Sequence, residues 1–222
     1  PWTQALTQAL VKIDPEKYAS ELNLNIESWT IASDQNWRVS TEYESQWKEA
    51  FFADSLWQQA KIVDKELHIP GGKGYVIWWQ PAGESQAQAE SLEAAKNTEK
   101  HYFRKTFDIS GLPISGILQI YADDTFDLYV NGEKVESYSF SAKKDSSAKV
   151  YTITDFLKSG QNVIAVEVQD TDHSSGGLEL VLDLKQIANW SEFKGTLVSP
   201  QSKSQEPSNS DKERYEVENK NL

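Results

Sequence analysis

The amino-acid sequence predicts an all-β fold, an antiparallel β-sandwich, that occupies residues 47–190. Three observations predict it. Apolar and polar residues alternate in several short runs, one run ends at an Asn-Gly pair, and the runs recur at near-regular spacing with turn residues between them. Alternation with a period of two gives a strand one buried face and one exposed face, and many short strands separated by turns are typical of two stacked sheets.

Residues 1–46 are predicted to form a helical leader or linker. Apolar residues first recur every three or four positions, as on one face of an amphipathic helix; they are Trp2, Leu6, Leu10 and Ile13. Asp14-Pro15-Glu16 then indicates the start of a second short helix, because aspartate is a good N-cap and proline fits the first helical turn. A strand is predicted from about Leu24 to Ile31. We expect the leader to pack against the sandwich or to connect it to an upstream region.

The strands of the sandwich are predicted from three alternating segments. Phe126, Leu128 and Val130 alternate with polar or aromatic residues and are followed by Asn131-Gly132. This pair predicts a hairpin, since a type I′ turn needs positive φ at both central residues. Residues 164–168 and 178–184 alternate in the same way, so each is predicted to bury every second side chain.

Two segments do not fit the strand pattern. Residues 81–100 are rich in Ala, Gln and Glu, which predicts a helical or mobile insertion between strands. Residues 191–222 are polar and form a predicted C-terminal tail, which a partner chain would hold in place if it is ordered.

Composition excludes several classes of function. The chain of 222 residues has 22 Lys and Arg against 34 Asp and Glu, a formal charge of −12, so neither nucleic-acid binding nor a polybasic membrane anchor is expected. It contains no cysteine, which excludes disulfides and cysteine-ligated metal sites. The apolar run at residues 75–79 is far shorter than the about 20 residues of a transmembrane helix. With Pro1 first and no methionine, we expect a processed or excised piece of a longer product.

Four motifs in this order resemble the galactose-binding-domain-like β-sandwich, and in particular the non-catalytic sugar-binding modules of family 2 glycoside hydrolases and α-L-rhamnosidases. They are residues 52–57 (FADSLW), 101–108 (HYFRKTFD), 120–132 (IYADDTFDLYVNG) and 151–166 (YTITDFLKSGQNVIAV). Gly176-Gly177-Leu178 also begins the last strand as in that family. The resemblance implies a jelly-roll fold and no catalytic barrel within this chain.

The resemblance implies a non-catalytic module that binds carbohydrate. One alternative is a docking subunit that mediates protein–protein contacts in a larger assembly, periplasmic or extracellular, and another is an accessory fragment of a glycoside hydrolase. Catalysis by the chain itself is not expected. Its three histidines form no zinc-hydrolase motif, no Gly-x-Ser-x-Gly elbow is present, and abundant carboxylates such as Asp127 are ordinary in an acidic protein.

A sugar site combines an aromatic platform with a few polar groups. Trp78 and Trp79 are the candidate platform, with the alternative that they close the core against the leader. Asp170, Asp172 and His173 are the candidate polar groups, because residues 169–177 form a polar loop at one end of the sandwich, unless that loop is only a connector.

The adjacent carboxylates of Asp123 and Asp124 are candidate ligands of a structural calcium ion, since calcium takes carboxylate and carbonyl oxygens. The alternative is that one aspartate bonds backbone amides where a strand begins while the other is solvated. No other cofactor is expected.

Overall fold

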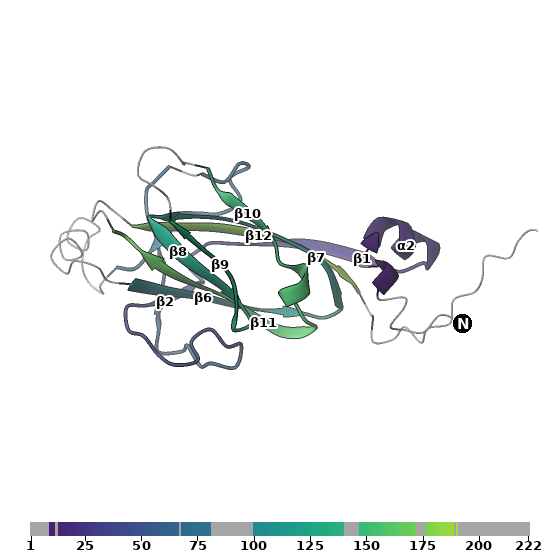
Figure 1. The fold of residues 1–222 in the computed structure, drawn as a ribbon, viewed down its shortest axis with the longest axis horizontal. Coiled ribbons are helices and arrows are strands. Elements are labelled where there is room, and N and C mark those ends of the chain that lie inside the picture. The colour runs from purple at the N-terminus through teal and green to yellow at the C-terminus, as the bar shows by residue number, and fades with distance from the viewer. Residues whose placement is uncertain are drawn as a thin grey trace, which may run out of the picture.

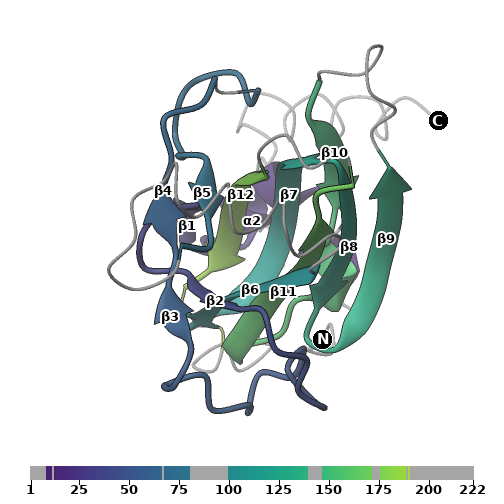
Figure 2. The same cartoon turned by 90° about the vertical axis from the view of Figure 1, so that its left-hand side faces the viewer.

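The computed structural model describes residues 9–11, 13–66, 68–80, 100–139, 147–171, 176–188 and 190. They form two antiparallel sheets of six strands each, stacked face to face (Figures 1 and 2). In the order of the sheet, sheet A contains β10 (Lys149–Thr152), β7 (Leu112–Asp123), β12 (Gly177–Ile187), β5 (Ile77–Trp78) and β4 (Lys61–Ile62), with β1 (Ile26–Ala32) also paired to β12.

Sheet B contains the remaining strands. In order they are β3 (Gln58–Gln59), β2 (Arg38–Ser40), β6 (Lys100–Ile109), β11 (Gly160–Gln169), β8 (Thr125–Val130) and β9 (Glu133–Ser139). A short 3₁₀ helix, η1 (Thr154–Phe156), connects β10 to β11. The predicted all-β antiparallel sandwich is confirmed.

The sandwich begins earlier in the chain than residue 47. β1 pairs with β12 from Ile26↔Ile187 to Ala32↔Val181, and β2 pairs with β6. The strand predicted near Leu24 to Ile31 is therefore confirmed, but the domain boundary predicted at residues 46 and 47 is wrong. The reason is that β1, which lacks a clear alternating pattern, is held in the sheet by its pairing with β12, more than a hundred residues away in the sequence.

β1 and β5 share one edge of β12, and Ser33 fills the space between them. The backbone N–H of Ser33 donates to the Leu180 carbonyl (2.8 Å), and its Oγ accepts from the Leu180 N–H (3.0 Å) and donates to the Tyr75 carbonyl (2.6 Å). Ser33 is fully buried, and its hydroxyl supplies the bonds that an unbroken strand would otherwise make.

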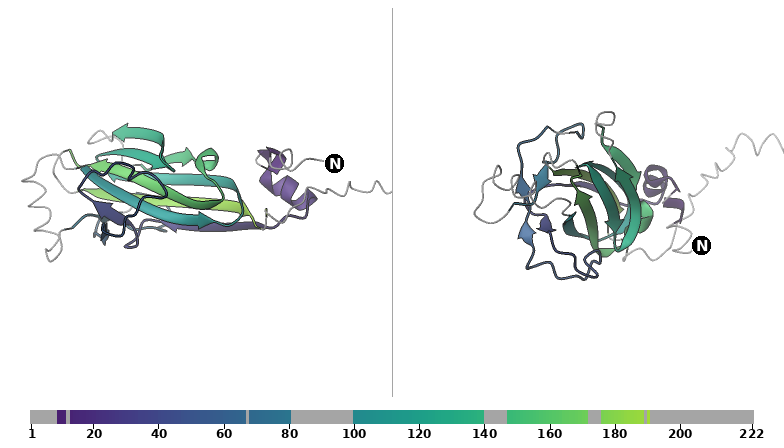
Figure 3. Two further views of the ribbon diagram at one scale, coloured as in Figure 1. Left: turned by 90° about the horizontal axis from the view of Figure 1, so that it is seen from below. Right: turned by 60° about the vertical axis from the view of Figure 1, so that its left-hand side comes forward.

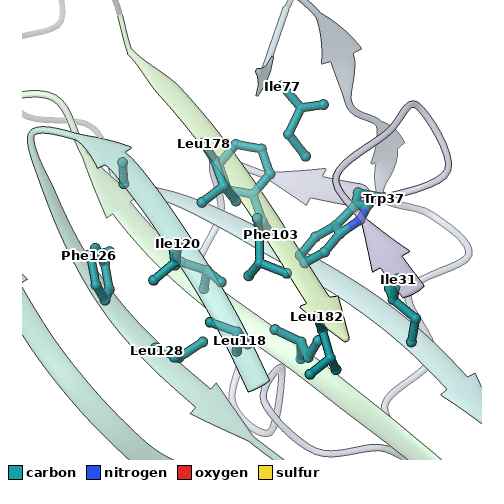
Figure 4. Close-up of a cluster of buried hydrophobic side chains, with 14 of the residues drawn as sticks. Ile31, Trp37, Ile77, Phe103, Leu118, Ile120, Phe126, Leu128, Leu178 and Leu182 are labelled. Carbon is teal, nitrogen blue, oxygen red and sulfur yellow. The ribbon is translucent and has the colours of Figure 1, made fainter. Parts of the chain in front are cut away.

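The main core lies between the sheets. Side chains from both sheets point toward one another there, among them Phe103, Leu118, Ile120, Leu128 and Leu182 (Figure 4). Leu180 and Val166 are completely buried, as the alternating pattern predicts. Burying one such side chain contributes about 1.5–3 kcal/mol, so the paired inner faces are the main source of stability.

The hairpin between β8 and β9 turns at the predicted Asn-Gly pair. Asn131 and Gly132 have φ of 53° and 87°, the left-handed conformation that a type I′ turn requires. The Asn131 side chain also donates to the Phe156 carbonyl (2.8 Å) and to Asn162 Oδ1 (2.8 Å), and it accepts from the Val163 N–H (3.0 Å). One residue thus sets the turn and ties it to the loop before β11.

The leader packs at one end of the sandwich, where β7 begins and β12 ends (Figure 3). Helix α2 (Pro15–Glu21) begins as predicted, with the Asp14 carboxylate accepting from the Lys17 N–H (3.1 Å). The buried apolar residue before it is Val11, whereas Ile13 is exposed, so the predicted apolar face is rotated. Trp2 and Leu6 lie outside the described residues.

The predicted insertion, apart from Lys100 at the start of β6, and the predicted tail also lie outside the described residues. Within the described ranges, no helix has the length and apolar character needed to span a membrane.

Candidate binding groove on the outer face of sheet B

Two rows of polar side chains cross the outer face of sheet B. Cross-strand pairing places Glu167 between Tyr102 and Asp127, and Asp127 opposite Ser137. Side chains directly opposite in an antiparallel pair stand on the same face, about 5 Å apart at Cβ. The residues that alternate with them in β8 and β11, such as Leu128 and Val166, belong to the core, so this row faces away from it. The neighbouring row runs Lys100, Gln169, Thr125, Ser139.

These rows line an open groove with a volume of about 320 Å³. Its lining residues come from β6, β8, β9 and β11, which lie side by side in Figure 2. They are Lys100, Thr125, Phe126, Asp127, Ser137, Tyr138, Ser139, Glu167 and Gln169. The groove therefore offers carboxylates, hydroxyls, an amide and an ammonium group on a rigid sheet.

Asp127 is held as a carboxylate by its neighbours. Its Oδ1 accepts from Ser137 Oγ (2.6 Å), and its Oδ2 accepts from Lys134 Nζ (3.0 Å) and from the Tyr129 hydroxyl (3.3 Å). Burial alone would raise the pKa of Asp127, but the hydrogen bonds from Ser137 and Lys134 outweigh it and lower the pKa below its ordinary value. Burial, together with the charge of Asp127, raises the pKa of Tyr129 to about 12, so that hydroxyl keeps its proton.

Glu167 and Lys100 form the second charged pair of the groove. Lys100 Nζ lies 2.5 Å from Glu167 Oε1, and this hydrogen bond raises the pKa of Lys100 above its ordinary value. Among the described residues, none donates a hydrogen bond to the other oxygen, Oε2 of Glu167. The Glu167 carboxylate therefore keeps acceptor capacity for a ligand.

An aromatic residue stands beside the groove. Tyr43 is 65% exposed, and its ring lies edge-on to that of Tyr102, with 5.8 Å between the centroids. Tyr102 is the cross-strand neighbour of Glu167, so the Tyr43 ring stands at the margin of the polar row. An exposed ring next to carboxylate and hydroxyl groups is the combination expected of a sugar site.

Arg104 fixes residues 47–54, the segment that follows Tyr43 and covers the rest of this face. Arg104 is fully buried and donates to Asp54 Oδ2 (2.9 Å) and to the carbonyls of Trp47, Glu49 (3.1 Å) and Phe52 (3.2 Å). Its guanidinium group also lies over the Phe52 ring, 4.9 Å from the centroid.

Trp47 completes this cover. Its ring packs edge-on against Tyr102 (5.0 Å) and Tyr129 (5.8 Å), which are both neighbours of the polar row. A packed aromatic layer held by a buried arginine therefore covers the part of sheet B next to the polar row.

The predicted tryptophan platform lies elsewhere. Trp78 is 4% exposed and belongs to the main core, where it packs against His101 and Phe103 with centroids 4.4 and 5.7 Å away. A ring so deeply buried has no face to offer a sugar, so Trp78 is a core residue in this structure. Trp79 is partly buried against the same core and lies 5.7 Å from the His101 ring. Both pack on strand β6 rather than on the leader helix.

The predicted polar loop is described only in part. Asp170 is buried, at 8% exposure, and Asp172 and His173 lie outside the described residues. Asp170 follows directly after Gln169, which lines the end of the groove.

The two predicted calcium ligands differ in environment. Asp124 is buried, and its Oδ2 accepts from the N–H (2.8 Å) and hydroxyl (2.6 Å) of Thr171. Asp123 lies 3.4 Å from Lys65 Nζ. Burial, together with a hydrogen bond to Asp124, raises the pKa of Asp123 to about 6. In the described part of the chain, no three His, Cys, Asp or Glu side chains are placed to hold a metal ion. The calcium site stays a prediction.

Sequence reasoning missed the groove for identifiable reasons. Tyr43 falls in the segment that the sequence predicts to be the leader, and Asp127 is one of many acidic residues in the chain. Glu167, like Asp127, occupies an outward position in an alternating strand, which is where an exposed charge is ordinary. The pairing of β8 with β11 places the carboxylates of Asp127 and Glu167 side by side and would have predicted the site. A single sequence does not show which strands pair.

Comparison with known proteins gives partial matches. No protein-family model matches the chain. An alpha-L-rhamnosidase of Formosa agariphila is 37% identical over 78 residues, which are 33% of this chain and 8% of that protein. The chain thus spans less than a tenth of this relative.

Solved structures with a similar sandwich include a Bacteroides uniformis beta-glucuronidase, with a TM-score of 0.49 and 15% identity over 71% of this chain and 18% of the other. A glycosyl hydrolase family 2 member from Bacteroides cellulosilyticus has a TM-score of 0.45 and 18% identity over 70% and 20%. A Streptomyces avermitilis alpha-L-rhamnosidase complexed with L-rhamnose has a TM-score of 0.35 and 27% identity over 40% and 9%. The chain is a β-sandwich that is similar, over a third of its length, to part of an α-L-rhamnosidase.

Proposed function

We propose that the chain is a non-catalytic carbohydrate-binding module whose site is the groove on the outer face of sheet B. The observation that carries the proposal is the cross-strand pair Asp127 and Glu167, placed in an open groove beside the exposed Tyr43. Carboxylates accept hydrogen bonds from sugar hydroxyls, and an aromatic ring packs on the apolar C–H groups of a sugar. The sequence match to an α-L-rhamnosidase supports a glycan as the ligand.

The chemistry of the groove supports binding rather than hydrolysis. A glycosidase needs one carboxyl group that stays protonated near neutral pH to act as general acid. Asp127 is in the opposite state, because Ser137 and Lys134 lower its pKa. Glu167 is paired with Lys100, whose Nζ lies 2.5 Å from Glu167 Oε1. The lowered pKa of Asp127 therefore fits an acceptor of hydrogen bonds better than a general acid.

Titration with a broad panel of neutral and acidic glycans, followed by calorimetry or by ¹⁵N NMR of the protein, tests the proposal. We expect binding at millimolar concentrations or below, with shifts in the amide signals of β8 and β11. Tyr43→Ala and Asp127→Asn should each weaken binding about 5- to 30-fold, since loss of a stacked ring or a charged hydrogen bond costs about 1–2 kcal/mol.

Tyr75→Ala is the matched control, because Tyr75 is similarly exposed (53%) but lies outside the groove; its affinity should be unchanged. Silence across the panel would reject the proposal, and a defined oligomer or co-purifying chain in the same preparation would then favour a docking subunit. Equal losses in Tyr43→Ala and Tyr75→Ala would show that the sugar binds elsewhere.

A further inference from the structure

The charges of the groove bear on the chemical class of sugar it can hold. Asp127 and Glu167 stand side by side, while the basic residue among the described lining residues is Lys100. Lys100 is already bound to Glu167 (2.5 Å), and the nearby Lys134 is bound to Asp127 (3.0 Å). Both ammonium groups are therefore engaged, and the chain as a whole carries a formal charge of −12.

The carboxylates of Asp127 and Glu167 can accept hydrogen bonds from a ligand but cannot donate them. Glu167 Oε2 has no donor among the described residues, and Asp127 Oδ1 has a single one, Ser137. The hydrogen bonds to Asp127 lower its pKa, which keeps it ionised at neutral pH. A sugar hydroxyl brings a hydrogen that such an oxygen can accept, and two neighbouring hydroxyls can each donate to one of the two carboxylates of this cross-strand pair, whose Cβ atoms stand about 5 Å apart.

A uronic acid fits this surface badly. Its carboxylate has no hydrogen to donate and needs a cation, so it would have to draw Lys100 or Lys134 away from an aspartate or glutamate that is partly buried. The side chains of Glu167 and Asp127 are 17% and 29% exposed, so their charges are only partly screened by water.

Resting on the proposed function, we infer that the groove binds uncharged sugars through neighbouring free hydroxyls and discriminates against uronic acids. Asp127 and Glu167 supply this selectivity: they accept from the hydroxyls of a neutral ring and repel a carboxylate at the same place. Beside the groove, Tyr43 contributes affinity for either kind of ring and no selectivity for charge.

Matched pairs of ligands test the inference. Methyl β-D-galactoside and methyl β-D-galactosiduronate differ only at C6, as do methyl β-D-glucoside and methyl β-D-glucosiduronate. For at least one pair, titration followed by ¹⁵N NMR should show the neutral member binding about fivefold tighter or more at low salt, as expected for repulsion between nearby like charges. In 1 M NaCl, where the Debye length is about 3 Å, the difference should shrink.

The double variant Asp127→Asn/Glu167→Gln removes both charges and keeps amide oxygens as acceptors, so the ratio of neutral to acidic affinity should fall toward one. Asp183→Asn is the matched control: Asp183 is also a strand aspartate bound to a lysine, Lys73 (2.7 Å), but on sheet A. Its ratio should equal that of the wild type.

The wild-type ratio decides between outcomes. If all four glycosides fail to bind, the inference is refuted, whereas the proposed function falls only if the whole glycan panel is silent. If uronides bind as tightly as their neutral counterparts or tighter, with shifts in β8 and β11, the groove remains a sugar site and the inference alone is refuted. The same holds if Asp183→Asn changes the ratio as much as the double variant.

Discussion

Replacing Arg104 by alanine should destabilise the protein and release residues 47–54, which cover part of the outer face of sheet B. Arg104 is fully buried and holds four acceptors: the Asp54 carboxylate and three backbone carbonyls between Trp47 and Phe52. Removing one partner of a buried ion pair costs about 3–5 kcal/mol, because the other polar groups lose their partners in a place that water reaches poorly. Since the Asp54 side chain is 21% exposed and can be partly solvated, we expect the lower end, about 3 kcal/mol.

Urea unfolding measures this loss. Far-UV circular dichroism reports the sheets. Tryptophan fluorescence reports all eight tryptophans, among them Trp47 and Trp57, whose rings stack with centroids 6.3 Å apart, so Trp47→Phe/Trp57→Phe serves as the background that isolates their signal. Fluorescence should shift to longer wavelength at low urea, before the sheets unfold, if the cover separates first. Arg104→Lys should recover part of the loss, because an ammonium group can reach Asp54 without serving all three carbonyls.

Arg38→Ala is the matched control. Arg38 is the cross-strand neighbour of Arg104 but makes one bond, to the Trp57 carbonyl (3.2 Å), so we expect a loss of about 1 kcal/mol or less. The reasoning is refuted if Arg104→Ala lies within about 1 kcal/mol of the wild type, or if the two arginine variants lose the same stability.

Three further predictions concern stability. Gly176→Ala should lower it by about 1–3 kcal/mol in urea, because a Cβ there would lie 1.9 Å from the ring of the buried Trp78; an unchanged midpoint would contradict this packing. Asn131→Gly should tolerate the positive φ of the turn but lose the side-chain hydrogen bonds, whereas Asn131→Ala should both strain the turn and lose those bonds. The melting temperature should therefore be highest for the wild type, lower for Asn131→Gly and lowest for Asn131→Ala. A higher melting temperature for Asn131→Ala than for Asn131→Gly would count against the turn assignment. Burial raises the pKa of Asp123 from 3.8 to about 6. The protonated Asp123 side chain therefore contributes its full stability below pH 3.8, and this contribution is lost as the pH rises through 6. The free energy of unfolding of the wild type should fall between pH 4 and 7 relative to that of Asp123→Asn, and parallel pH profiles would disprove the shift.

The larger strands were predictable from the sequence because their pattern is local. In β8, β11 and β12 every second residue is apolar, and a half-buried strand needs nothing else to be recognised. The turn at Asn131-Gly132 was predictable for the same reason, since its conformation is a property of two adjacent residues. By contrast, β3, β4 and β5 are two residues long, too short to show a period, and exist only because longer strands lie beside them.

The site depended on contacts that no local pattern reveals. The alternation of a strand predicts that Trp78 and Trp79 point to opposite faces, but it does not predict which of the two is buried. Trp78 is buried because it packs against His101 and Phe103 on strand β6. Likewise, Asp124 could not be paired in advance with Thr171, which lies 47 residues away. Tyr43 lies at the margin of the polar row through its contact with Tyr102. The segment that follows it is held by Arg104, a buried charged residue at an outward position of β6 where local alternation predicts exposure to solvent.

The pairing of Ile26 with Ile187 means that the polypeptide enters and leaves the sandwich at neighbouring points. A module of this kind can be inserted into a surface loop of another protein without forcing the two halves of its host apart, because the host chain resumes almost where it was interrupted.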